Sequence, residues 1–225
     1  MDGLEFDDTF HAYTFDGKVV PSVTKIMSPL VSYYRVPTER LRLAADRGKA
    51  VHAATEEYDK GLLPHMDGFE PGFIHAWMAF RHDYKFVPTH IEERVYHPVH
   101  EYAGTADRFG TLKGHPAVID IKTTASLGPA VGVQLAAYQQ AANFALMPRN
   151  QLTQRYAVQL CDDGTYKVKH YTNPHDWPAF LGCLALYHWQ RETHQGQKGE
   201  IRLVPLPADR TTPTDDQTTP IQLRS

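Results

Sequence analysis

The chain has 225 residues, of which 42% are hydrophobic and 22% charged, and its formal net charge is −3. These proportions indicate a globular protein of one ordinary domain that is large enough to bury a core. No apolar run reaches the roughly 18–20 residues that cross a bilayer, and the acidic start MDGLEFDDTF lacks the pattern of a secretory signal. We therefore expect a cytoplasmic protein without a membrane partner.

The cysteine content and the net charge narrow the function classes further. Cys161 and Cys183 are the two cysteines, too few for a four-cysteine zinc site or an iron–sulfur cluster, and we expect free thiols. A charge of −3 does not indicate a nucleic-acid binder, since such domains are often basic. It does not exclude a protein whose carboxylates hold cations against phosphates.

The first half of the chain predicts a hairpin followed by helices. In HAYTFDGKVV, two β-type runs flank Asp16-Gly17, which predicts an N-terminal hairpin over about residues 10–20. A short helix is expected after Pro21-Ser22, and a longer one over residues 38–61, with Gly48 as either a kink or a boundary between two helices. A further helix is expected over residues 71–86.

The second half predicts strands that alternate with helices. Strands are expected over residues 93–100, 102–112, 116–123, 153–160 and 165–171, and helices over residues 130–146 and 175–194. We therefore predict one α/β domain over residues 1–204, in which helices flank a mixed central sheet. The remaining residues 205–225 are rich in Pro, Thr and Asp, which is typical of a disordered tail.

The stretch AVIDIKTT, residues 117–124, carries an acid and a lysine at the end of an apolar strand. Asp120 and Lys122 lie two positions apart, so both side chains point to the same face. Charges on a buried strand are costly without partners, which favours a function over a solvated ion pair. The similar string Asp16-Gly17-Lys18 has no apolar lead-in and predicts a turn. These residues by themselves leave a catalytic site and an exposed ion pair as open alternatives.

A second acid, Asp107 in GTADRFG, lies on the strand before Asp120, and a tight turn at residues 113–115 would bring both to one end of the sheet. Two nearby carboxylates repel each other unless a divalent cation lies between them. The side chain of Ile121 would enter the core, while its carbonyl is available as a further ligand. The Lys122 ammonium would hold an attacking water and offset charge on a phosphate.

In this order, RGKAVHAATEEY, YAGTADRFG, VIDIKTT and QLAAY resemble the RecB-type branch of the PD-(D/E)xK nuclease superfamily. The likeness is greatest to compact phage-type and mitochondrial-genome-maintenance-type exonucleases, and HAYTFDGKVVPSVTKIM is similar to their N-terminal segment. The resemblance covers about residues 10–190 and implies a restriction-endonuclease-like core. The proline that names the superfamily is Ala106 here, a position at which RecB-type members vary.

The resemblance also implies roles for individual residues. It implies a Mg²⁺ or Mn²⁺ site whose ligands are His52, Asp107, Asp120 and the carbonyl of Ile121. Lys122 would be catalytic beside the two acids, and Glu56, one helical turn after His52, is added to this catalytic group. Gln134 and Tyr138 match a Gln-x-x-x-Tyr motif that contacts substrate.

Two other clusters have competing interpretations. Basic residues precede His52 and form either a solvated helix face or a surface for DNA phosphates, with Arg47 and Lys49 nearest the site; they are Arg35, Arg40, Arg42, Arg47 and Lys49. The string HPVHE, residues 97–101, has metal-like spacing but no partner cluster, so we interpret it as unrelated to the site.

The implied activity is hydrolysis of DNA phosphodiester bonds by a water that the cation activates, with exonuclease favoured. The setting implied is a bacterial or phage-infected cell and DNA recombination, repair or degradation. The expected partner is DNA, and a separate recombination or replication protein is a second candidate. The oligomeric state is left open. A structure-selective endonuclease and a catalytically silent DNA-binding or assembly module are the alternatives.

Overall fold

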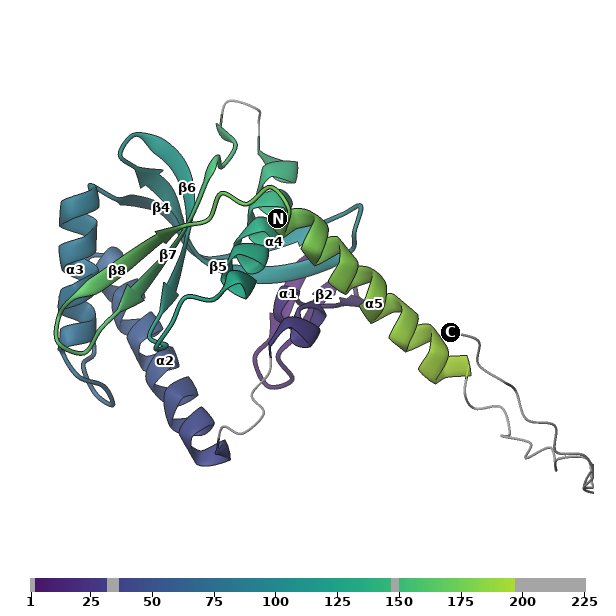
Figure 1. The fold of residues 1–225 in the computed structure, drawn as a ribbon, viewed down its shortest axis with the longest axis horizontal. Helices are drawn as coiled ribbons and strands as arrows, with labels where there is room; N and C mark the ends of the chain where they lie inside the picture. The colour runs from purple at the N-terminus through teal and green to yellow at the C-terminus, as the bar shows by residue number, and fades with distance from the viewer. Residues whose placement is uncertain (1–2, 32–36, 147–149, 197–225) are drawn as a thin grey trace, which may run out of the picture.

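The computed structural model describes residues 3–31, 37–146 and 150–196, which form two β-sheets and their flanking helices (Figure 1). The smaller sheet is antiparallel and consists of β1 (Leu4–Asp7), β2 (Ala12–Phe15) and β3 (Lys18–Val20). The larger sheet has its five strands in chain order: β4 (Val87–His97), β5 (Tyr102–Leu112), β6 (His115–Lys122), β7 (Gln154–Leu160) and β8 (Tyr166–His170). The predicted mixed sheet and N-terminal hairpin are confirmed, and β1 is an additional strand.

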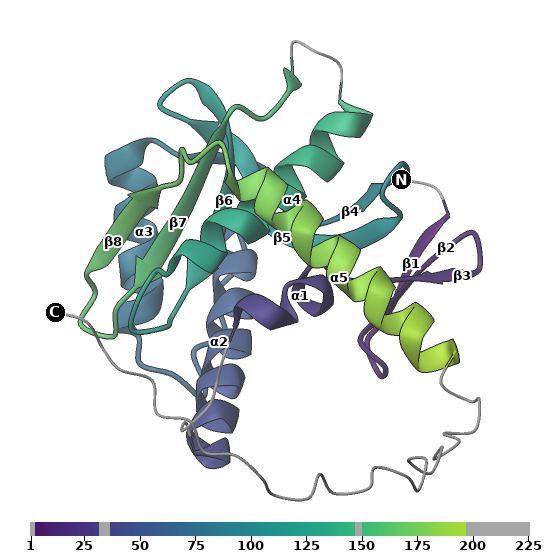
Figure 2. The same ribbon diagram turned by 45° about the vertical axis from the view of Figure 1, so that its right-hand side comes forward.

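Helices cover both faces of the larger sheet (Figures 1 and 2). On one face lie α2 (Thr38–Asp59) and α3 (Gly72–Tyr84). On the other lie α1 (Val23–Ile26), α4 (Pro129–Ala145) and α5 (Asp176–Gly196), and a 3-10 turn, η1 (Ser28–Leu30), follows α1. Helix α2 runs unbroken through Gly48, so no boundary between two helices lies there. No helix among these residues is long and apolar enough to cross a membrane.

Strand β6 is the centre of the larger sheet. It pairs antiparallel with β5 and parallel with β7, and α4 makes the crossover between the two parallel strands. Ile119 and Ile121 are fully buried among residues of α2 and α3, whereas Val118 packs in the core beneath α4. Burial on both faces matches the continuous apolar run that precedes Asp120.

Tight turns place the strand ends. Lys113 and Gly114 have φ values of 49° and 87°, the left-handed pair that a two-residue hairpin turn requires, and they join β5 to β6. Asp16 and Gly17 have φ values of 48° and 76° and make the same kind of turn. The turn interpretation of Asp16-Gly17-Lys18 is therefore confirmed.

Some boundaries differ from the sequence-based expectations. Strand β4 begins at Val87 rather than at residue 93, and residues 98–100 form a turn rather than strand, since Pro98 has no N–H for the ladder. Cys161 and Cys183 are free thiols. The expected tail over residues 205–225 and the basic residue Arg35 lie outside the described residues.

Candidate active site

Asp107 and Asp120 lie next to each other where the ladder between β5 and β6 ends, in the middle of β5 and near the end of β6. The ladder between β5 and β6 extends to Arg108 opposite Ile119, and the next positions in this register are Asp107 and Asp120. Asp107 Oδ2 accepts a hydrogen bond from the backbone N–H of Ile121 at 2.6 Å. The two-residue turn of the β5–β6 hairpin sets the register that places the two acids opposite each other.

Asp120 is buried with only part of its carboxylate satisfied. The residue is 2% exposed, and its Oδ1 accepts a hydrogen bond from Lys122 Nζ at 2.9 Å. Its Oδ2 is buried and has no hydrogen-bond partner among the described residues. Burial raises the pKa of Asp120 to about 6, although the nearby Lys122 ammonium opposes that rise. An unpartnered buried oxygen is costly, so this atom points to a missing partner.

Helix α2 brings His52 next to Asp107 and the Ile121 carbonyl. His52 Nε2 lies 3.0 Å from the carbonyl oxygen of Ile121, and Nδ1 lies 3.7 Å from Asp107 Oδ1. Burial would lower the pKa of His52, but the Asp107 and Glu92 carboxylates outweigh it and raise the pKa to about 9. The imidazole therefore lies among the Ile121 carbonyl oxygen and the carboxylate oxygens of Asp107 and Glu92.

Glu92 on β4 is a member of this cluster that the sequence analysis missed. Its Oε1 lies 3.8 Å from His52 Nδ1, and His52, Glu92 and Asp107 each offer one ligand atom within 4.8 Å of the others. Among the described residues no other group of three such side chains meets this criterion. The string HIEERVYH carries no signal that separates Glu92 from its neighbour Glu93.

These residues fit a divalent cation. An imidazole nitrogen, several carboxylate oxygens and a backbone carbonyl are ligands that Mn²⁺ or Mg²⁺ accepts. The unpartnered Asp120 Oδ2 is the observation that favours a cation most directly, because a cation would satisfy it. His52, Asp107, Asp120 and the Ile121 carbonyl are the predicted ligands. The structure brings His52, Asp107 and the Ile121 carbonyl together, whereas Asp120 lies outside the group of three ligand atoms that His52, Glu92 and Asp107 form.

A polar chain links the Lys122 side chain to helix α4. Lys122 Nζ lies 3.4 Å from Gln134 Oε1, and Gln134 Nε2 donates a hydrogen bond to the Tyr138 hydroxyl at 3.1 Å. Burial raises the pKa of Tyr138 well above its usual value, so this hydroxyl remains protonated. The i, i+4 spacing of Gln134 and Tyr138 thus lets Gln134 connect the tyrosine to the lysine.

Gly104 on β5 provides the space that the Tyr138 ring occupies. A Cβ atom at Gly104 would lie 2.7 Å from Tyr138 Cε1 and 3.2 Å from Val23 Cγ2. We expect Gly104→Ala to displace the ring and to lower the free energy of unfolding by about 1–3 kcal/mol, the usual cost of overpacking. Urea denaturation measures this change. Gly182→Ala is the control, because nothing lies within 4 Å of its Cβ position in α5, and alanine favours a helix. A Gly104→Ala protein as stable as wild type would contradict the prediction.

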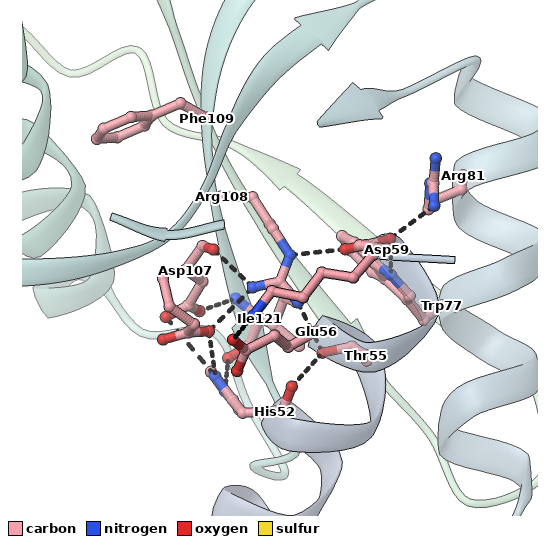
Figure 3. A network of polar contacts seen from close by, with 12 residues as sticks. His52, Thr55, Glu56, Asp59, Trp77, Arg81, Asp107, Arg108, Phe109 and Ile121 are labelled. Carbon is pink, nitrogen blue, oxygen red and sulfur yellow. Dashed lines mark hydrogen bonds and ion pairs between the residues drawn. The ribbon is translucent and has the colours of Figure 1, made fainter. Parts of the chain in front are cut away.

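Behind the site lies a buried ion-pair network that the sequence did not predict (Figure 3). Arg108 is fully buried, and its Nε lies 2.6 Å from Asp59 Oδ2. Asp59, at the end of α2, also accepts hydrogen bonds from Arg81 Nη1 at 2.6 Å and Trp77 Nε1 at 3.0 Å. The network ties α2 and α3 to β5 next to Asp107.

The remaining predicted residues lie around this centre. Glu56 forms an ion pair with Lys60 and borders, with Glu92, a hollow of about 420 Å³; it is outside the metal-ligand group. Arg47 Nη2 donates a hydrogen bond to the Thr123 carbonyl at 3.2 Å, so this arginine also holds the end of β6. Lys49 is exposed on α2.

The HPVHE string has a packing role. His97 is 7% exposed, and its ring stacks against Tyr102 and Trp177. Its Nδ1 accepts a hydrogen bond from the backbone N–H of His100. These contacts agree with the interpretation that the string is unrelated to the site.

Comparison with known proteins gives a likeness of fold. No protein-family model and no curated protein matches the chain. A solved structure of a protein assigned as an exonuclease, from Eubacterium rectale, superposes with a TM-score of 0.52 at 11% identity, covering 87% of this chain and 91% of that one. The two proteins share a fold. An alkaline exonuclease from Laribacter hongkongensis, LHK-Exo, matches in two structures. The structure in complex with dAMP has a TM-score of 0.46 at 10% identity, covering 80% of this chain and 91% of that one. The other has a TM-score of 0.39 at 11% identity, covering 79% of this chain and 94% of that one.

Proposed function

We propose that the chain is a DNA nuclease that depends on Mg²⁺ or Mn²⁺ and acts as an exonuclease. One observation supports the proposal: Asp107, Asp120 and Lys122 lie together where the β5–β6 ladder ends, and a buried oxygen of Asp120 has no hydrogen-bond partner among the described residues. The fold that the chain shares with the Eubacterium rectale protein supports the same assignment.

The residues divide the chemistry between them. His52, Asp107, Asp120 and the Ile121 carbonyl would hold the cation. A bound divalent cation lowers the pKa of water and stabilises negative charge on a phosphate. Hydrolysis forms one P–O bond to the water oxygen and breaks one P–O ester bond, and the proton that the water loses is balanced by one that the leaving oxygen gains.

Lys122 would act on the reacting atoms as a fixed cation. Its ammonium is 2.9 Å from Asp120 Oδ1 and 3.4 Å from Gln134 Oε1, so two elements orient it. In this position it would donate to the attacking water and offset charge that builds on the phosphate. The neutral Tyr138 hydroxyl accepts a hydrogen bond from Gln134 Nε2 and so holds the Gln134 side chain in place.

The finer assignments follow the residue pattern. RecB-type membership rests on the ordered motifs around His52, Asp107, Asp120 and Gln134, and the exonuclease assignment rests on the same resemblance. The proposed setting is the cytoplasm of a bacterial or phage-infected cell, with DNA as the partner in recombination, repair or degradation.

The topology of the DNA substrate tests the proposal. We expect the wild-type protein with Mg²⁺ or Mn²⁺ to degrade linear DNA and to leave a covalently closed circle intact, with chelation of the cation stopping the reaction. Gel electrophoresis of both substrates over time provides the measurement. Cutting of the circle would favour the structure-selective endonuclease instead. If neither single-stranded nor duplex DNA is cut in either form, the chain is not a nuclease, and the DNA-binding module becomes the better assignment.

A further inference from the structure

The backbone of β4 is distorted at Glu92. Glu92 has a φ of 49°, a left-handed conformation that costs energy for a residue with a side chain. Its neighbours Ile91 and Glu93 pair normally with Arg108 and Ala106 of β5. The Glu92 carboxylate nevertheless lies in the group with His52 and Asp107, so the distortion sits at the candidate cation site.

Arg108 holds the Glu92 carboxylate in that position. The Arg108 side chain is 0% exposed, and its Nη1 donates to Glu92 Oε1 at 2.9 Å and to the Asp107 carbonyl at 2.6 Å. Its Nε pairs with Asp59, which is also 0% exposed. Asp59 also pairs with Arg81, so the Arg108 guanidinium is shared between two carboxylates and fixes the Glu92 side chain beside His52 and Asp107.

We infer that Glu92 is a further ligand of the cation and that Arg108 is its positioning residue. The inference rests on the proposed function and deepens its metal site. Acidic side chains gather on many surfaces, but here the neighbouring Asp120 supplies an independent observation. Its Oδ2 is buried without a hydrogen-bond partner among the described residues, and its carboxylate is close enough to feel the Asp107 and His52 charges. A cation held by His52 and Asp107 would lie within reach of Glu92, whose ligand atom belongs to the same group of three.

Calorimetric titration of Mn²⁺ into the full chain tests the role of Glu92. We expect Glu92→Gln, which keeps the shape of the side chain, to weaken Mn²⁺ binding about 10–100-fold. Glu93→Gln removes the same charge one residue away, outside the ligand group, and should change the affinity less than about threefold, as a screened charge does. If the glutamine variant does not fold, Glu92→Asp keeps the charge and should still lose affinity, because its shorter side chain retracts the oxygens.

A double-mutant cycle tests the role of Arg108. Arg108→Lys should weaken Mn²⁺ binding. The double variant Arg108→Lys with Glu92→Gln should bind Mn²⁺ no more weakly than Glu92→Gln alone, because both changes remove the same contact between Arg108 and Glu92. Additive losses of affinity would contradict the positioning role of Arg108. A Mn²⁺ affinity within threefold of wild type for both Glu92→Gln and Glu92→Asp would contradict the assignment of Glu92 as a ligand. Wild-type protein that binds Mn²⁺ but cuts no DNA would instead contradict the proposed function and leave the ligand assignment standing.

Discussion

Lys122→Ala should lower the turnover rate of DNA cleavage by about 10²–10³-fold, the usual loss when a preorganised group that stabilises the transition state is removed. The ammonium is oriented by Asp120 and Gln134, and its side chain is only 23% exposed, so water would replace it poorly. Because Lys122 carries a positive charge, its removal should not weaken binding of Mn²⁺. Single-turnover cleavage of linear DNA at saturating Mn²⁺, with calorimetry alongside, separates these two effects.

Lys18→Ala is the matched control for this experiment. Lys18 belongs to the similar string Asp16-Gly17-Lys18, but it lies on β3 and forms an exposed ion pair with Glu101. We expect its removal to leave the cleavage rate unchanged. A Lys122→Ala protein that retains more than about a tenth of the wild-type rate would contradict the catalytic role, because a loss below tenfold is smaller than such a group supplies.

Asp59→Ala should lower the free energy of unfolding by about 3–5 kcal/mol, because it leaves the buried Arg108 charge without its main partner. The Asp59 carboxylate is 0% exposed and also accepts hydrogen bonds from Arg81 and Trp77, so three donors lose their acceptor together. Urea denaturation in the absence of metal measures the change. The cation then makes no contribution to the difference.

Asp46→Ala is the control on the same helix. Asp46 pairs with Arg42 on the surface of α2, and both side chains are more than half exposed. Its removal should leave the denaturation midpoint close to that of wild type, because solvent screens such pairs. If Asp59→Ala is as stable as Asp46→Ala, the buried network is not what joins α2 to β5.

The central strand could be predicted from the sequence because its physical cause is local. Ala117-Val118-Ile119 forms a continuous apolar run, and the two charges that follow it conflict with burial unless they have partners. The structure shows those partners, with Lys122 bonded to Asp120 and Gln134. The turn at Lys113-Gly114 is also local, and it determines that Asp107 and Asp120 meet.

Glu92 and Arg108 could not be predicted because their roles depend on tertiary contacts. The string offers two adjacent glutamates without showing which one faces the site, and the left-handed backbone at Glu92 has no signal in the sequence. Arg108 follows Asp107 in the string GTADRFG and, as a charged residue, resembles an exposed strand position. Its burial depends on Asp59, 49 positions earlier in the chain, which no short-range pattern connects to it.

The two roles of helix α2 have a consequence for the order in which the protein becomes active. This helix contributes His52 to the cation site and Asp59 to the buried ion pair, while Asp107 and Asp120 come from strands formed later in the chain. A partly folded chain therefore has no complete set of ligands. A cation that binds only the native site also stabilises the native state. In the proposed nuclease, the ability to cut DNA would thus require α2 to be docked on β5 and β6.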